Sequence, residues 1–438
     1  MNHDFCVGEL RLQVVCCLLF VALLLTSCAS SQNSQGNVMR ISEIDGYFVS
    51  VAAGHGTTFA VHNDGSLWMW GRNVASDYGF SSEVHSDESG RLFLGARRID
   101  IDGDVTFVCA SGGGGMSAAR GHVMTITCDG TLWGWGYNSF GQVGNGTHRF
   151  QPVPTKIMSD VVSVSTSSFA TTAITTDGTL WAWGLNTHGK FGDIGRLSVL
   201  PVPIMDDVAY VSSGFRHTLA IKTDGTLWGM GLASALGIGT GHPVGLPTAN
   251  VAAVISPVKI MSDVVAVAAG GFHSLAVTSD GGLWVWGYNT IGQLGIGTPS
   301  HSREILNSVY PIRIKEGVCT IAAGYAHSAA ITANGTLYVW GLNESRADYI
   351  YAQSILLPKR LMDDAVSVQI STNSRPFHAH FLAAKNDGTL WAWGENTFGQ
   401  LGDGTFAGGS EWNPVLIHAS STNYSPAIIA IPLNSSPF

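Results

Sequence analysis

The chain has 438 residues, of which 45% are hydrophobic, only 12% are charged and 54 are glycine. Low charge with abundant glycine excludes a mainly helical or disordered protein and favours short strands joined by tight turns. The formal net charge is −9, and the absence of a basic cluster argues against nucleic acid as a partner.

The first element in chain order is predicted to be a lipoprotein signal peptide, residues 1–27. An apolar run of twelve residues, Val14–Leu25, is too short to span a membrane as a helix, which needs about 20 residues. The run ends in Leu-Thr-Ser-Cys28, which resembles the lipobox of bacterial lipoproteins. Cys28 is therefore expected to be diacylated and to become the first mature residue. An ordinary cleaved signal peptide or an anchor helix is the alternative, because two acids and one base precede the run.

Residues 28–37 are small and polar and are predicted to be a flexible tether to a folded domain at 38–438. The mature protein is then expected in the cell envelope, lipid-anchored on the extracytoplasmic side of a membrane. Among the cysteines of the mature protein, Cys109 and Cys128 are the only pair close in sequence, and whether they pair stays open. The spacing of cysteines and histidines suggests neither a metal site nor a cofactor.

An eight-residue phrase of the type D-G-x-L-W-x-W-G then recurs seven times. Its copies lie at residues 64–71, 129–136, 177–184, 224–231, 280–287, 334–341 and 387–394. Asp-Gly between β-type runs is a strong hairpin signal, because glycine adopts positive φ without strain. The recurrence predicts an all-β fold, a seven-bladed β-propeller of four-stranded blades. A solenoid would also fit the period, but it would need capping repeats.

Two large rings stand two residues apart in almost every copy. Because such residues face the same way on a strand, we interpret them as wedges between blades rather than as a sugar platform. Seven residues before the turn, five copies carry a histidine: His122, His217, His273, His327 and His380. We expect each imidazole to bond backbone within its own blade; a ring of metal ligands around the central channel is the alternative.

These segments together resemble the repeats of the regulator of chromosome condensation family. The hairpin phrase follows a G-x-x-H-[ST]-L-A strand and precedes a loop of the type G-Y-N-x-x-G-Q-[LV]-G, clearest at 136–144, 287–295 and 394–402. The loops from Gly184 and Gly231 are degraded, and those from Gly71 and Gly341 have lost the pattern. The resemblance covers about residues 38–417 and implies a seven-bladed propeller. Family members bind different partners, so it implies no particular ligand.

The leading functional hypothesis is a non-catalytic, monomeric scaffold that binds another protein or an envelope polymer. No catalytic residue is assigned, because no nucleophile elbow, zinc motif, P-loop or dinucleotide fingerprint is present. The alternative is an enzyme acting on envelope glycans with acids at the channel mouth. The acids considered for it are Asp206, Asp207, Asp363, Asp364 and Glu395.

Binding specificity is expected where repeats differ, in four stretches that break the period: 74–98, 111–121, 232–256 and 343–357. Exposed aromatic residues are common anchors of protein interfaces. The possible binding-loop aromatics are Tyr78, Phe80, Phe93, Tyr349 and Tyr351. The alternative is that these stretches are neutral surface insertions.

The last element concerns closure of the ring, because the chain contains one outer-strand segment too many. Segments resembling an outer strand lie both before the first hairpin, at 38–41, and after the last, at Pro414–Ile417. A bare strand edge would invite aggregation. We predict that Pro414–Ile417 completes blade seven and that the N-terminal segment packs outside it or next to the tether.

Overall fold

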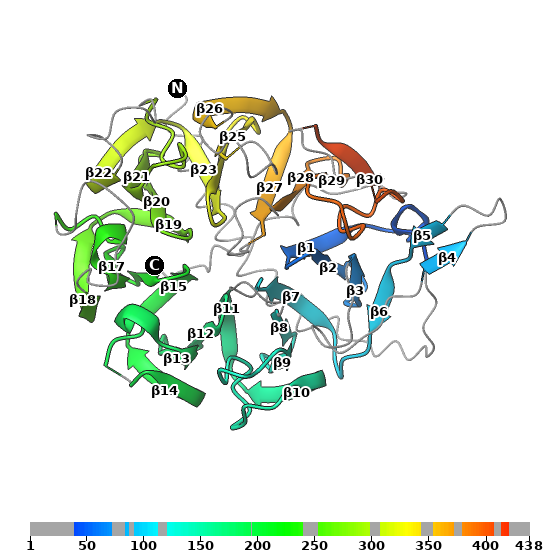
Figure 1. Cartoon of the computed structure of the whole chain (residues 1–438), viewed down its shortest axis with the longest axis horizontal. Helices are drawn as coiled ribbons and strands as arrows, with labels where there is room; N and C mark the ends of the chain where they lie inside the picture. The colour runs from blue at the N-terminus through cyan, green and yellow to red at the C-terminus, as the bar shows by residue number, and fades with distance from the viewer. Residues whose placement is uncertain are drawn as a thin grey trace.

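The computed structural model describes residues 39–71, 84–86, 92–112, 121–193, 195–239, 253–297, 307–342, 354–371, 379–406 and 413–419, with backbone only at 84–86 and 92–94. Seven four-stranded antiparallel sheets form a ring of blades, in which the first strand lies innermost and the fourth at the rim (Figure 1). The predicted seven-bladed propeller is therefore confirmed.

Each blade takes its strands in chain order. Blade 1 contains β1 (Phe48–Ala53), β2 (Thr57–His62), β3 (Leu67–Gly71) and β6 (Arg97–Ile99), and blade 2 contains β7 (Val105–Ala110), β8 (His122–Thr127), β9 (Leu132–Gly136) and β10 (Gln151–Met158). Blade 3 contains β11 (Val161–Ser167), β12 (Ala170–Thr175), β13 (Leu180–Leu185) and β14 (Leu197–Met205), and blade 4 contains β15 (Val208–Ser213), β16 (His217–Lys222), β17 (Leu227–Leu232) and β18 (Ala253–Met261).

The remaining blades repeat this order. Blade 5 contains β19 (Val264–Ala269), β20 (His273–Thr278), β21 (Leu283–Tyr288) and β22 (Asn307–Lys315), and blade 6 contains β23 (Val318–Ala323), β24 (His327–Thr332), β25 (Leu337–Gly341) and β26 (Ile355–Met362). Blade 7 contains β27 (Ala365–Ile370), β28 (His380–Lys385), β29 (Leu390–Gly394) and β30 (Val415–His418). Outside the blades lie the hairpin β4 (Val84–Ser86) and β5 (Leu92–Leu94) and the short 3-10 helices η1 (Ile41–Glu43), η2 (Thr187–Gly189) and η3 (Ala233–Ala235).

The hairpin phrase folds as its residue types predict. In blade 3, the carboxylate of Asp177 accepts hydrogen bonds from the Thr179 amide at 3.0 Å and the Thr175 hydroxyl at 2.6 Å. The same hydroxyl accepts the indole N–H of Trp181 at 3.0 Å. Gly178 turns the chain with a φ of 81°. These bonds to the ionised form lower the pKa of Asp177, the Thr175 bond contributing most.

The core lies between the blades rather than within them. The second ring of the phrase is fully buried in six blades, at Trp70, Trp135, Trp183, Trp286, Trp340 and Trp393. Trp183 of blade 3, for example, shares a cluster with Met124, Ile126 and Leu132 of blade 2. The interpretation of these indoles as wedges is therefore confirmed.

Alternating strand direction gives the ring two different faces. The hairpin face carries the seven phrase turns and the links between blades, and the loop face carries the connections from strand one to two and from three to four. The links are tight: Asp160, Asp207, Asp263 and Asp364 each have a φ of 61°, which aspartate tolerates better than most residues. All four period-breaking stretches join strand ends on the loop face.

The C-terminal strand closes blade 7 as predicted. β30 pairs antiparallel with β29, placing Trp391 opposite Leu416 and Leu390 opposite His418. The N-terminal segment instead lies where blades 7 and 1 meet. Met39 bridges Ala96 beside β6, and Ile41 packs in the same core cluster as Trp70.

Candidate functional site

The most distinctive surface of the described chain is formed by three neighbouring connections on the loop face. They join strands one and two in blades 4, 5 and 6, with the sequences Gly-Phe215-Arg, Gly-Gly-Phe272 and Gly-Tyr325-Ala. The amide of Phe215 donates to the carbonyl of Gly270 at 3.3 Å, and the amide of Gly271 to the carbonyl of Gly324 at 3.2 Å. The three connections therefore touch backbone to backbone.

Glycine permits this close approach. A Cβ added to Gly214 would lie 2.5 Å from the carbonyl oxygen of Gly270, and one added to Gly271 would lie 2.6 Å from that of Tyr325. Both distances are shorter than real Cβ contacts. Any side chain at these positions would push the blades' loops apart and separate the rings that they carry.

The rings of Phe215, Phe272 and Tyr325 form a triangle. Their centroids are 5.9 Å, 5.8 Å and 5.5 Å apart in edge-to-face geometry. The guanidinium of Arg216 lies over Phe272 at 5.0 Å and over Phe215 at 5.6 Å. All four side chains are partly exposed. We call Phe215, Arg216, Phe272 and Tyr325 the aromatic–arginine cluster.

The positive charge of Arg216 in this cluster is available to a ligand. Burial lowers the pKa of Arg216, and burial raises the pKa of Tyr325. The ion pairs found in the described part of the chain do not include Arg216. A cation held on aromatic faces without a carboxylate suits recognition of an acidic group within an apolar surface.

The histidines that follow these connections form hydrogen bonds across the junctions between neighbouring blades. Nε2 of His217 lies 2.8 Å from the hydroxyl of Ser274, and Nε2 of His273 lies 2.9 Å from that of Ser328. Each hydroxyl donates to a backbone carbonyl at 2.8 Å, so it accepts from the imidazole. Burial lowers the pKa of His273 to about 3, which keeps the ring neutral.

The expected partner was therefore wrong for four of the five histidines, whereas His327 bonds the backbone of Leu342 in its own blade. We predicted backbone within the same blade, but four of the five bond a side-chain hydroxyl of the next blade. These are His122 with Thr171, His217 with Ser274, His273 with Ser328 and His380 with Thr58. The ring at the start of strand two reaches across the junction, which a reading of one repeat could not reveal. No group of three or more metal-ligating side chains gathers in the described residues.

Most sequence-predicted site residues lie outside the described residues. This holds for Cys28, Tyr78, Phe80, Tyr349 and Tyr351, and Phe93 lies in β5, where only the backbone is described. The strand ends flanking these stretches lie on the loop face, as the cluster does. Sequence reasoning missed the cluster because its members occupy the two variable positions of the G-x-x-H segment on three different blades. The available signal was an aromatic residue in the G-x-x-H segment of three successive blades.

The acids considered for a glycan-acting enzyme are divided between the two faces of the ring. Asp206 and Asp207 occupy the link before β15, and Asp363 and Asp364 occupy the link before β27, both on the hairpin face. Asp363 pairs with Arg360. Glu395 follows β29 on the loop face. Paired catalytic carboxylates must lie within about 10 Å of one another, and residues on opposite faces do not form such a pair.

The structure also answers whether Cys109 and Cys128 form a disulfide. Cys109 has a free thiol, so it does not pair with Cys128. Burial raises the pKa of this thiol to about 12, which leaves little reactive thiolate at neutral pH. Within the residues that can be described, no helix is long and apolar enough to cross a membrane.

The ring of blades and its loop-face site place this protein in the class of seven-bladed propellers that present loops on one face. The sequence matches the RCC1-like domain over residues 105–431 and the regulator of chromosome condensation (RCC1) repeat over residues 48–79. The chain belongs to the RCC1-like domain family.

Relatives of this chain differ widely in size. It is 34% identical to human E3 ubiquitin-protein ligase HERC2 over 174 residues, which are 39% of this chain and 3% of that protein. It is 28% identical to the Arabidopsis thaliana ultraviolet-B receptor UVR8 over 66% of each chain. The chain thus spans between 3% and 66% of the lengths of these two relatives.

Solved structures agree with the fold. Saccharomyces cerevisiae Prp20p, described together with its binding to Gsp1p and histones, superposes with a TM-score of 0.60 at 21% identity, covering 73% of this chain and 79% of that one. Human WBSCR16 gives 0.61 at 21% identity, covering 80% and 93%. At this identity the likeness concerns the fold alone.

Proposed function

We propose that this protein is a non-catalytic propeller that binds another protein through its loop face. The observation that carries the proposal is the aromatic–arginine cluster on three adjacent blades. Aromatic and arginine side chains dominate the binding energy of protein interfaces. The cluster is held rigid by backbone contacts between its loops, so little conformational entropy is lost when a partner docks.

The relatives are consistent with this function. Prp20p is described as binding Gsp1p and histones, and UVR8 is described as a receptor. The strand ends that flank the four period-breaking stretches lie on the same face as the cluster, and these stretches are where the repeats differ in sequence. We infer that specificity comes from these stretches and affinity from the cluster.

The test compares two cations at opposite ends of β16. Arg216 precedes the strand on the loop face and contacts Phe215 and Phe272, whereas Lys222 ends it on the hairpin face and lies 5.7 Å from the Trp228 ring. A soluble fragment from Ser30 onward would be used to capture partners and then to measure their affinity. Arg216→Ala should weaken binding about 30-fold or more, equivalent to roughly 2 kcal/mol.

Lys222→Ala is the matched control, since it also removes a cation from an aromatic ring and should change affinity less than about threefold. Equal losses in both variants would point to a general effect of net charge. No loss with Arg216→Ala would remove the cluster from the binding surface.

We further propose that the protein acts outside the cytoplasm, anchored by lipid at Cys28, where an envelope polymer is a second possible partner. This location rests on the sequence Leu-Thr-Ser-Cys28 after a short apolar run. Cys28→Ala should abolish incorporation of labelled fatty acid and leave an unprocessed or soluble product. Unchanged labelling would refute the anchor without affecting the proposed binding face.

A further inference from the structure

The junction that closes the ring is unlike the other six. Residues 39–47, which we call the strap, precede β1 and lie against the C-terminal strand β30 of blade 7. Met39 and Ala96 exchange two backbone hydrogen bonds at 3.2 Å and 2.7 Å. Ile41 is 2% exposed and joins the core cluster that contains Trp70 and Ile417. Both chain ends therefore contribute to closure.

His418, at the end of β30, bonds the strap at two points. Nδ1 lies 3.0 Å from the carbonyl oxygen of Ile41, and Nε2 lies 3.0 Å from that of Gly46. The ring is 1% exposed, so water does not replace either contact. A carbonyl oxygen only accepts hydrogen bonds. Both bonds therefore exist only while both ring nitrogens carry hydrogen, which is the imidazolium form.

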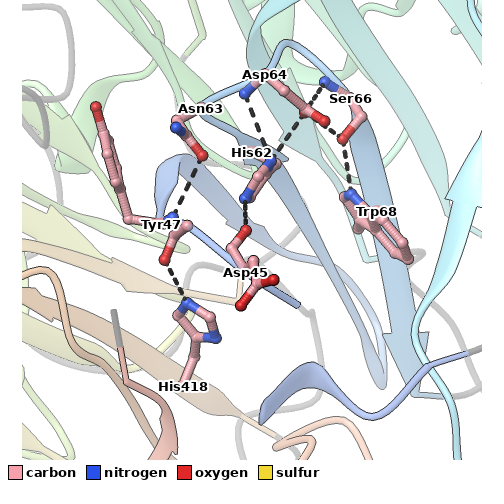
Figure 2. A network of polar contacts seen from close by, with 9 residues as sticks. Asp45, Tyr47, His62, Asn63, Asp64, Ser66, Trp68 and His418 are labelled. Carbon is pink, nitrogen blue, oxygen red and sulfur yellow. Dashed lines mark hydrogen bonds and ion pairs between the residues drawn. The ribbon is translucent and has the colours of Figure 1, made fainter. Parts of the chain in front are cut away.

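His62, at the end of β2, holds the strap from the other side (Figure 2). Its Nε2 lies 2.6 Å from the carbonyl oxygen of Asp45, and its Nδ1 lies 2.9 Å from Oδ1 of Asp64. The His62 ring beside Asp64 holds the pKa of that carboxyl well below its usual range. The Asp64 amide also lies 3.4 Å from the same Nδ1.

The two histidines are packed around one aromatic residue. The ring of Phe48 meets His62 at 5.7 Å and His418 at 5.1 Å, both edge to face. Gly46 fits between them only as glycine, since a Cβ there would lie 2.5 Å from Nε2 of His62. The strap is therefore held by a small, closely packed set of contacts rather than by a long sheet edge.

The charged groups near this site do not supply an alternative partner for His418. On the strap, Arg40 pairs with Glu43, and the Asp45 side chain is exposed. On the blade 7 hairpin beside β30, Lys385 lies over the Trp391 ring and Asp387 bonds Thr389. On blade 1, Asp64 faces His62. Within the part of the chain that the structure describes, only backbone carbonyls face the two ring nitrogens of His418.

We propose that the strap is a proton-dependent fastener of the propeller, closed by the imidazolium form of His418 and supported by His62. Closing the strap takes up a proton, so acidic conditions favour the closed ring and rising pH loosens it. Imidazole changes charge between about pH 5 and 8. One linked proton changes the closing equilibrium by at most tenfold per pH unit.

The first measurement uses the wild-type protein, so it does not depend on a variant that folds. Hydrogen–deuterium exchange of residues 39–47 would be followed from pH 5.5 to 8.5 and corrected for the intrinsic exchange rate. Protection of the strap should fall by up to tenfold per pH unit. The link at residues 158–161 joins blades 2 and 3 without a histidine and is the internal reference, whose protection should stay constant.

The second measurement compares two buried histidines by thermal unfolding over the same pH range. His418→Gln should lower the melting temperature at acidic pH and remove the pH dependence of strap protection, because one amide nitrogen cannot serve both carbonyls. His273→Gln should lower the melting temperature but keep that dependence, since His273 is neutral. Strap protection that is independent of pH, or an unchanged pH profile in His418→Gln, would overturn the proposal.

Discussion

At the scale of single residues, the closing glycine of six of the seven hairpin phrases is required for two separate reasons. Gly287 has a φ of 100°, where a side chain is strained. A Cβ there would also lie 2.6 Å from the carbonyl oxygen of Phe272 and 2.8 Å from the Cα of His273. The first reason is visible in the sequence as a turn signal, whereas the second depends on how strand three passes the start of strand two.

A pair of glycine substitutions separates these reasons. Gly404 has a φ of 78° but nothing within 4 Å of an added Cβ. Gly404→Ala should cost about 1–2 kcal/mol of backbone strain. Gly287→Ala should cost about 2–3 kcal/mol more, because a closely packed region must also shift. Urea unfolding of both variants tests this, and equal losses would mean that the backbone conformation alone matters.

Lys190 is a second residue whose environment the sequence did not reveal. It occupies the loop position held by Gln142, Gln293 and Gln400 in other blades. It is 2% exposed, and its Nζ lies 2.7 Å from the hydroxyl of Ser167. Burial lowers the pKa of Lys190 to about 7, whereas an unfolded lysine titrates near pH 10.4.

Lys190→Gln should therefore stabilise the protein by about 1–4 kcal/mol at pH 7 or below, since it removes a buried charge without a carboxylate partner. Between pH 7 and 10 the unfolded chain holds a proton on Lys190 that the folded chain has lost. Wild-type stability then rises with pH, and the gain from the substitution shrinks. Chemical denaturation at pH 6 and pH 9.5 measures this; a gain that does not shrink contradicts the lowered pKa.

At the scale of elements, each well-formed junction contains a three-part polar latch. A histidine bonds a hydroxyl of the next blade, and that hydroxyl and the indole N–H of the same next blade both donate to one backbone carbonyl of the preceding loop. Between blades 5 and 6 these are His273, Ser328, Trp340 and the carbonyl of Gln293. The same latch closes the ring between blades 7 and 1, through His380, Thr58 and Trp70 on the carbonyl of Gln400.

Three junctions, between blades 1 and 2, 3 and 4, and 6 and 7, lack parts of the latch. Blade 2 has Val123 and blade 7 has Phe381 in place of the hydroxyl, and the indole nitrogens of Trp135 and Trp393 find no hydrogen-bond partner among the described residues. Both junctions follow a loop that has lost the G-Q pattern. At the junction of blades 3 and 4, Ala170 replaces the histidine, and the hydroxyl of Thr218 has no hydrogen-bond partner among the described residues. Single parts of the latch are therefore retained, although a buried polar group without a partner is costly.

The coupling between the imidazole and the hydroxyl of the latch can be tested with a double-mutant cycle. Ser328→Ala should cost about 1–3 kcal/mol, since it leaves the Nε2–H of His273 without an acceptor. Adding His273→Gln should then cost less than it does in the wild-type protein, by about 0.5–3 kcal/mol of coupling. Equilibrium unfolding of the two single variants and the double variant gives the value. Additive losses would show that the imidazole and the hydroxyl act independently.

At the scale of the whole molecule, closure depends on the C-terminal strand and the strap in different ways. β30 supplies the backbone partner of β29, and its Ile417 is 3% exposed in the core cluster that includes Ile41. The strap adds attachments through the side chains of His418, His62 and Asn63 but no strand to a blade. The outer edge of blade 7 is thus completed by the C-terminus alone.

Truncation should distinguish the two ends. Removing residues 412–438 should lower the free energy of unfolding by at least about 2–5 kcal/mol, which is the cost of truncating one buried isoleucine. The loss should be larger because the truncation also exposes the edge of β29. Removing residues 1–38 leaves every described residue in place and should change the melting temperature little. Calorimetry of both truncated proteins measures the difference. The assignment of β30 as the closing strand fails if the C-terminal truncation is tolerated while removal of residues 39–47 unfolds the ring.

Much of the architecture was already determined by the sequence. The Asp-Gly turns, the paired rings and the recurring spacing predicted seven hairpins, four strands in each blade and Pro414–Ile417 as the last strand. These features depend on interactions within one repeat, such as Asp177 with Thr175 and Thr179. Because a turn and its flanking strands are local, they are visible in any single copy.

Only the tertiary structure decided what happens between blades. The partners of the histidines, the triangle of Phe215, Phe272 and Tyr325 and the position of the strap beside His418 all join residues about 50 or more positions apart. Their contacts depend on the distance at which the ring places neighbouring blades. Glycines such as Gly214 and Gly271 allow close approach only if the facing loop is also narrow. A single repeat specifies its own hairpins. A junction depends on the sequences of two repeats and on the spacing that ring closure imposes on neighbouring blades.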